Sequence, residues 1–295
     1  MLWVPSQRNF IALVGFVGVC VWFLAPLVEL FALASDDGQF SHVLLIPWLT
    51  FYLLFINRTA ILTSHAWNPT VGVLVMASGT VCSWLADGQD WTQDRLALKI
   101  LAFTVVCAGL FFLSFGTACF RNNLFALVML FFMVPLPMVL LHAVNEFLQR
   151  GSADMVDFMF LVLEIPVFRE EFIFELSNFT ILIGEECSGI RSFLVLVITS
   201  LVAGYWFLTS WWTRVALVAV VVPMAIVKNA FRIVGLALLA NYVDPSYITD
   251  SVLHRAGGIP LFLLSLVILF FVVWLLRRFE KRHGYCQPDG LRARV

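Results

Sequence analysis

Three residues in the C-terminal half of the chain have the types needed for acyl transfer. Cys187 lies in Gly184-Glu-Glu-Cys-Ser-Gly-Ile-Arg-Ser192, directly before an apolar stretch. Arg232 lies within the next apolar stretch, and His254 lies in a polar segment just before the last one. A thiol forms a thioester with a carbonyl substrate, an imidazole accepts and returns protons, and a guanidinium stabilises an oxyanion. These residues indicate a cysteine-dependent acyl transfer.

The neighbours of Cys187 favour a reactive thiol. The pattern predicts a helix that starts at Ser188, so the thiol would lie at its N-terminus, where free N–H groups and the helix dipole favour the thiolate. Ser188 and Gly189 allow close backbone approach, and Arg191 adds positive charge one turn later. Glu186, with its neighbour Glu185, either orients His254 or Arg232 or is solvated near the membrane interface.

Two cations lie inside one apolar stretch, where charge is unfavourable and therefore informative. Lys228 and Arg232 are four residues apart and share one helical face. Counted from Val215, Arg232 lies roughly 25 Å along the axis, in the outer third of a hydrocarbon core of about 30 Å. Lys228 lies roughly 6 Å deeper. We expect Lys228 and Asn229 to support the helix rather than to react, whereas Arg232 acts in catalysis or pairs with a nearby glutamate.

The composition excludes a soluble domain. Of the 295 residues, 61% are hydrophobic and 13% charged, against about 45–50% and 25% in ordinary globular chains. The net charge of −1 gives no reason to propose nucleic acid as a partner. The six cysteines show no paired spacing of the zinc or disulfide kind. The sequence therefore predicts a polytopic membrane protein, and its chemistry requires neither a metal nor an organic cofactor.

The apolar pattern predicts an all-α polytopic membrane protein with about eight transmembrane helices. The second stretch is short for a span, and the fifth contains Pro135 and Pro137. The stretches are Phe10–Leu33, His42–Ile56, Thr70–Ala86, Leu96–Phe120, Leu124–Phe147, Ser188–Leu208, Val215–Tyr242 and Ile259–Trp274.

One long segment between these stretches is not uniformly apolar. From Arg150 to Glu186 it begins with a helical pattern and then changes period. Ile165–Arg169, Glu171–Leu176 and Phe179–Ile183 contain alternating or clustered β-formers, with the turn residues Ser177 and Asn178 between the last two. We expect a small β-hairpin that packs on the outer mouth of the bundle.

Basic residues predict the orientation of the chain. The C-terminal end carries Arg277, Arg278, Lys281, Arg282, Arg292 and Arg294. This cluster places the C-terminus in the cytoplasm, and eight spans then place the N-terminus there too. Cys187, Arg232 and His254 come to the outer face. Residues 1–276 are expected to form one transmembrane domain, with an outer segment at 150–186 and an active-site half at 187–276, followed by a basic cytoplasmic tail at 277–295.

At these residues the chain resembles the exosortase/archaeosortase family over about residues 38 to 276. The similarity rests on the order of Cys-Ser-Gly-x-Arg, Asn-x-x-Arg and a histidine before the last helix. Val43 departs from the family pattern, in which glycine follows Ser-His. The matching segments are Phe40-Ser-His-Val-Leu-Leu-Ile-Pro47, Pro135-Leu-Pro137, Ile165-Pro-Val-Phe-Arg169, Gly184–Ser192, Lys228-Asn-Ala-Phe-Arg-Ile233 and His254.

The resemblance implies a cysteine transpeptidase of the bacterial inner membrane. It implies substrates with a C-terminal sorting signal of the Pro-Glu-Pro type, followed by one membrane helix and a basic tail. It also implies that Cys187 is the nucleophile and that Arg232 and His254 are its partners. The remaining partners are membrane lipid and an acceptor nucleophile that the sequence does not identify.

Other classes of protein remain as alternatives. A transporter for an anionic solute would use Lys228 and Arg232, although the chain shows no convincing inverted repeat. A scaffold for surface polysaccharide assembly would not need Cys187. A serine intramembrane protease fits less well, because Ser188-Gly189 is only a dipeptide and the more reactive thiol precedes it.

Overall fold

The computed structural model describes residues 7–36, 38–64, 68–176, 179–184, 188–242 and 258–284. The chain divides into two compact units, one within residues 1–140 and the other within residues 141–288. Each unit is described by itself. The fold is that of an all-α polytopic membrane protein with one small antiparallel sheet.

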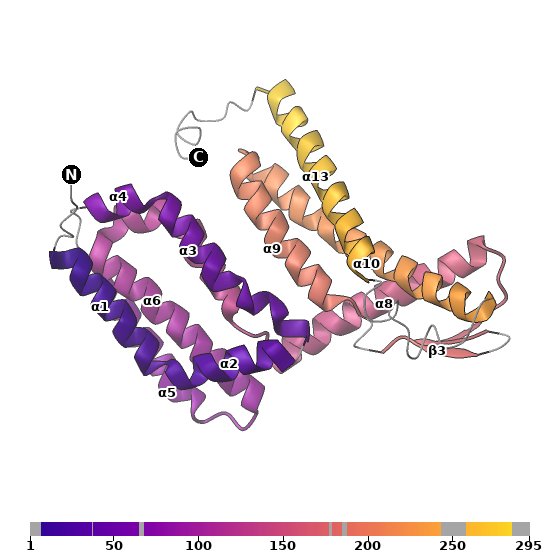
Figure 1. The fold of residues 1–295 in the computed structure, drawn as a ribbon, viewed down its shortest axis with the longest axis horizontal. Coiled ribbons are helices and arrows are strands. Elements are labelled where there is room, and N and C mark those ends of the chain that lie inside the picture. Colours follow the sequence, from indigo (N-terminus) through magenta and orange to yellow (C-terminus); the bar gives the residue numbers. More distant parts are fainter. Residues whose placement is uncertain are drawn as a thin grey trace. The chain divides into compact units, whose positions relative to one another are not determined.

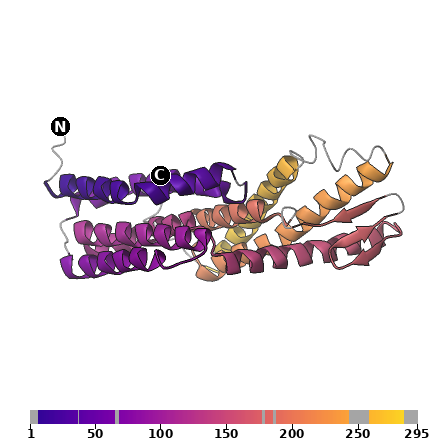
Figure 2. The same cartoon turned by 90° about the horizontal axis from the view of Figure 1, so that it is seen from below.

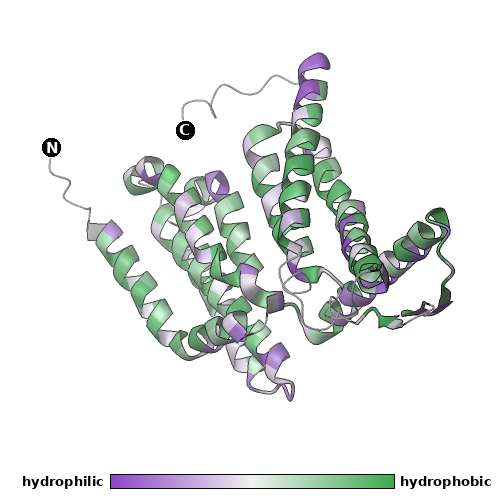
Figure 3. Ribbon diagram, turned by 45° about the vertical axis from the view of Figure 1, so that its right-hand side comes forward, coloured by the Kyte–Doolittle hydropathy of each residue, from purple (hydrophilic) through white to green (hydrophobic). Residues whose placement is uncertain are grey.

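Long helices dominate both units (Figure 1). Among the described residues, six helical segments are long and apolar enough to cross a membrane, and up to eight when each of two bent pairs counts as one span. Figure 3 shows apolar residues along most of each helix, whereas the last turns of α13 (Gly258–Arg282) are hydrophilic. The eight predicted stretches correspond to these six helices and two bent pairs.

The first unit consists of helices around a tightly packed pair, α5 (Pro69–Ala86) and α6 (Thr92–Asn122). A Cβ added at Gly72 would lie 2.7 Å from the Cα of Leu113, so only glycine allows this approach. The other elements are α1 (Gln7–Trp22), α2 (Leu24–Asp36), η1 (Gly38–Leu44), α3 (Ile46–Ile56), α4 (Arg58–Thr63), α7 (Leu124–Leu130) and η2 (Phe131–Met133).

The fifth apolar stretch departs from the expected single helix over Leu124–Phe147. It ends at η2, and a new helix, α8, runs over Met138–Val162. Pro135 and Pro137 cause the break, because proline has no N–H to donate and disfavours helical geometry in the residue before it. Asp94 then fixes the start of α8, since its Oδ1 accepts a hydrogen bond from the Met138 amide at 2.8 Å.

The described part of the second unit contains the rest of α8, a three-stranded sheet and three long helices. The sheet is antiparallel in the order β1 (Phe168–Glu170), β2 (Ile173–Glu175) and β3 (Thr180–Leu182). Glu175 pairs with Phe168 on one side and with Thr180 on the other. The predicted hairpin corresponds to β2 and β3, and β1 adds a third strand.

The sheet is held to the helices by an apolar core. Phe160 of α8 and Phe174 of β2 are fully buried with their ring centroids 6.1 Å apart. Ala230, Val234 and Ala237 of α10 (Trp211–Tyr242) complete this core. Figures 1 and 2 show the strands beside the end of α8 and the C-terminal half of α10. Ile183, which follows β3, is also buried in this core. The four residues from Gly184 to Cys187, called the Cys187 segment below, therefore start from a fixed point.

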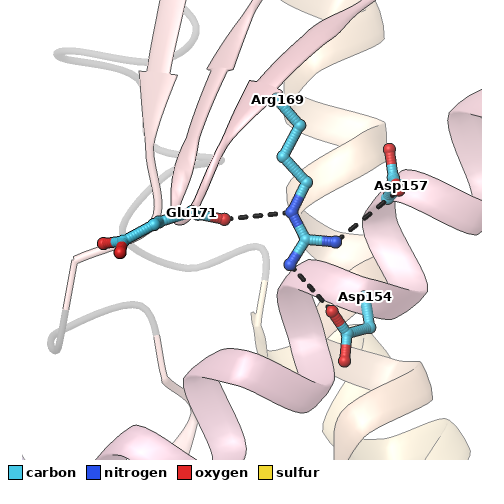
Figure 4. A network of polar contacts seen from close by, with 4 residues as sticks. All are labelled: Asp154, Asp157, Arg169 and Glu171. Atoms are coloured by element: carbon cyan, nitrogen blue, oxygen red, sulfur yellow. Dashed lines mark hydrogen bonds and ion pairs between the residues drawn. The ribbon is translucent and has the colours of Figure 1, made fainter.

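Arg169 ties the sheet to α8 (Figure 4). Its guanidinium lies 2.7 Å from the carboxylate of Asp154 and 3.6 Å from that of Asp157. Its Nε donates to the backbone carbonyl of Glu171 at 3.0 Å, within the turn between β1 and β2. One side chain thus joins two turns of α8 to the edge of the sheet.

A second apolar core joins α9 (Ile190–Phe207), α10 and α13. It contains Leu196 of α9, Leu217 and Val221 of α10, and Leu269 and Val273 of α13. The 32 residues of α10 extend over roughly 48 Å at the α-helical rise. This length exceeds a hydrocarbon core of about 30 Å, so one or both ends of α10 reach the polar interface.

The start of α10 is capped by a buried carboxylate from α13. Glu280 is 3% exposed and accepts hydrogen bonds from the amide of Thr209 at 3.0 Å and the amide of Ser210 at 2.8 Å. It also accepts from the hydroxyl of Thr213 at 2.5 Å. A negative charge at a helix N-terminus is favourable, and here it also satisfies amides that the helix leaves unpaired.

Glu280→Gln is expected to lower the free energy of unfolding by about 2 kcal/mol, because hydrogen bonds to a charged acceptor are replaced by weaker ones and an amide donor then faces backbone donors. Heat-induced unfolding in detergent measures the change. Glu146→Gln is the matched control, since Glu146 pairs with Arg150 on an exposed face and should contribute about 0.5 kcal/mol or less. Equal unfolding midpoints for the two variants would contradict the capping role.

Candidate functional site

The helix after the Cys187 segment begins two residues later than expected. α9 starts at Ile190, and Gly189 is its N-cap residue, with φ of 78° in the left-handed region that favours glycine. Cys187 and Glu186 lie outside the described residues, so the described chain resumes at Ser188. The position of Ser188 therefore fixes where the Cys187 segment ends.

Ser188 is held by α8. The serine is 2% exposed, and its hydroxyl donates to the Oδ1 of Asn145 at 2.9 Å. The hydroxyl oxygen of Ser188 also accepts a hydrogen bond from the Ile190 amide at 3.4 Å. Asn145 is itself 2% exposed. This buried hydrogen bond holds Ser188 in place, because leaving either partner unsatisfied costs about 1–3 kcal/mol.

Asn229 of α10 holds the other side of the same turn. Its side chain is 1% exposed, and its Nδ2 donates to the hydroxyl of Ser152 on α8 at 3.0 Å. Its carboxamide lies directly against Gly189, where an added Cβ would be 3.2 Å from both Cγ and Oδ1 of Asn229. The glycine is required both by its backbone conformation and by this contact.

A polar stripe on α8 supports the whole arrangement, and we did not predict it from the sequence. Asn145, Gln149 and Ser152 are spaced by four and three residues, so they share one helical face. Gln149 donates to the backbone carbonyl of Ile183, just before the Cys187 segment. The spacing of three polar residues in an apolar helix was the available signal. The broken fifth stretch hid it, because α8 was expected to end near Phe147.

The cations of α10 lie next to this network. Lys228 is half-buried and donates from Nζ to the hydroxyl of Ser192, in the first turn of α9. Ser192 in turn donates to the Gly189 carbonyl at 2.9 Å. Arg232 is half-buried one turn further along α10. Arg191 is exposed.

The structure thus brings together part of the expected site. Ser188, Gly189 and Asn229 meet at the start of α9, and Lys228 contacts the first turn of α9 from α10. Arg232 lies one turn further along α10. Cys187, Glu186 and His254 lie outside the described residues. Within the described ranges, no three His, Cys, Asp or Glu side chains are grouped so that they could hold a metal ion.

The long apolar helices define the chain as a multi-pass membrane protein, and its buried polar contacts gather at the start of α9. A family model described as transmembrane exosortase matches residues 32–271. The chain therefore belongs to the transmembrane exosortase family, whose members are generally cysteine transpeptidases that act on sorting signals. No curated protein and no solved structure matches the chain.

Gly189→Ala is expected to destabilise the protein by about 1–2 kcal/mol, because a Cβ is unfavourable in the left-handed region and would press on Asn229. Thermal unfolding in detergent measures this loss. Gly235→Ala on α10 is the control, since an added Cβ there meets nothing within 4 Å and alanine favours a helix. If Gly189→Ala left the unfolding midpoint unchanged, the junction would not be fixed as described.

Proposed function

We propose that this protein is a membrane-embedded cysteine transpeptidase that cleaves a C-terminal sorting signal of exported proteins. The observation that carries the proposal is the match to the transmembrane exosortase family over residues 32–271, which includes Cys187, Arg232 and His254. The buried polar network at the start of α9 supports it, because a nucleophile needs a loop held in one geometry.

In the proposed mechanism the thiolate of Cys187 attacks the scissile carbonyl carbon. Arg232 stabilises the oxyanion that develops on the carbonyl oxygen. The carbon–nitrogen bond then breaks, and His254 gives a proton to the leaving amine of the C-terminal helix. An acceptor amine or water attacks the resulting thioester, its proton passes to His254, and Cys187 leaves as the thiolate.

The proposed location follows the basic residues near the helix ends. We infer that the protein lies in the inner membrane with both termini in the cytoplasm and with the site at the outer face. A substrate helix would then dock beside α9, α10 and α13 with its scissile bond near the outer interface. Glu186 and Arg191 are proposed to support the site by orienting its charged groups.

Cys187→Ala is expected to abolish processing of a co-expressed reporter that ends in a Pro-Glu-Pro-type signal, a membrane helix and a basic tail. Arg232→Ala should slow processing by about 10²–10³-fold, as for loss of an oxyanion donor. His254→Ala should slow it by about 10²–10⁴-fold, as for loss of a general acid–base group. Intact mass of the reporter measures the loss of the tail and shows whether water or an acceptor ends the reaction.

Cys20→Ala is the matched control, because Cys20 is a half-buried free thiol in α1. It should process the reporter at the wild-type rate. Undiminished processing by Cys187→Ala, at equal abundance in the membrane, would disprove the nucleophile assignment. Solute flux that depends on Lys228 and Arg232, in a protein that leaves the reporter intact, would favour the transporter alternative instead.

A further inference from the structure

Lys228 is a charged side chain in the apolar helix α10 that the mechanism above does not use. Its Nζ donates to the hydroxyl of Ser192, and that hydroxyl donates to the carbonyl of Gly189. The ammonium group is therefore connected through one hydroxyl to the N-cap of α9. An ammonium has three donors, and this contact uses one of them.

The described residues offer Lys228 no carboxylate partner. Their ion pairs join Lys99 to Asp87, Arg150 to Glu146, and Arg169 to Asp154 and Asp157. The charged neighbour of Lys228 on its own helix is Arg232, four residues away and of the same sign. Like charges at this spacing repel, and the ammonium of Lys228 is unfavourable in an apolar span. An anion that bound between α9 and α10 would relieve both penalties.

We propose that Lys228, held in place by the hydroxyl of Ser192, binds an acidic side chain of the substrate and so determines specificity. This inference rests on the proposed function. A carboxylate only accepts hydrogen bonds, so it suits the remaining donors of the ammonium, and a charge pair is strong where water is excluded. Glu185 and Glu186 lie outside the described residues, and the experiment below separates a resident glutamate from a substrate carboxylate.

The spacing on α10 limits where the acidic residue lies in the substrate. Lys228 and Arg232 are about 6 Å apart along the helix axis at 1.5 Å per residue. An extended peptide covers this distance in about two residues. With Arg232 at the scissile carbonyl and Lys228 deeper in the membrane, the carboxylate falls within about two residues after the scissile bond, on the side of the leaving helix.

A double-mutant cycle between enzyme and substrate tests the proposal. Purified wild type and Lys228→Gln are each given a reporter with a single Glu in the signal and the same reporter with Gln there. We expect Lys228→Gln to process the Glu reporter about 10–100-fold more slowly than wild type does, as for loss of a charged hydrogen-bonded partner. Both enzymes should process the Gln reporter at the same rate. Lys228→Glu should regain activity on a reporter with Lys at that position.

Lys99→Gln is the control, because Lys99 forms its ion pair with Asp87 in the first unit, and it should process both reporters normally. If Lys228→Gln slows both reporters by the same factor, the carboxylate subsite is disproved. A resident glutamate or a purely structural role gives that result, and a drop in thermal stability or in the rate of Cys187 alkylation would accompany it. If wild type cleaves neither reporter, the proposed function fails and the subsite fails with it.

Discussion

Two buried hydrogen bonds hold the junction on which the rest of the site depends. Ser188 is hydrogen-bonded to Asn145 of α8, and Asn229 of α10 is hydrogen-bonded to Ser152 of α8 and packs against Gly189. The start of α9 is thus in contact with both α8 and α10. Apolar contact alone would let helices slide, since lipid and neighbouring helices are equally apolar. Directional polar bonds specify one register, and Asn229 can lie this close to the start of α9 because residue 189 is a glycine. The segment that carries Cys187 is thereby anchored at Ile183 and at Ser188.

The two apolar cores of the second unit join different elements. The core around Phe160 and Phe174 holds the small sheet on α8 and on the C-terminal half of α10. The core around Leu217 and Leu269 binds α9, α10 and α13 together, and Glu280 closes that bundle at the start of α10. The polar junction lies where α10 passes from one core to the other. Lys228 and Asn229 are adjacent on this helix, yet Lys228 contacts Ser192 of α9 and Asn229 contacts Ser152 of α8.

Much of the fold was predictable from the sequence, because membrane helices follow apolar length. The eight stretches match six helices long enough to span a membrane and two bent pairs. The change of period after Ile165 predicted the strands. The helical pattern after Arg150 was predicted, but its continuity with the preceding stretch was not, since Pro135 and Pro137 marked a break without showing that one helix would run from Met138 to Val162. We expected Lys228 and Asn229 to support their own helix. Only tertiary contacts reveal the junction with α8, in which Asn229 is hydrogen-bonded to Ser152 and Ser188 to Asn145.

The central claim is that the junction presents Cys187 as the nucleophile, and trapping the acyl-enzyme tests it most directly. Purified protein would be mixed with the reporter, quenched in acid within the first turnover and digested for peptide mass mapping. We predict that the peptide containing Cys187 gains the mass of the reporter peptide that ends at the scissile carbonyl, and that it loses this mass on treatment with hydroxylamine, as a thioester does. Processing without any adduct on Cys187, or with the adduct on Ser192, would contradict the account.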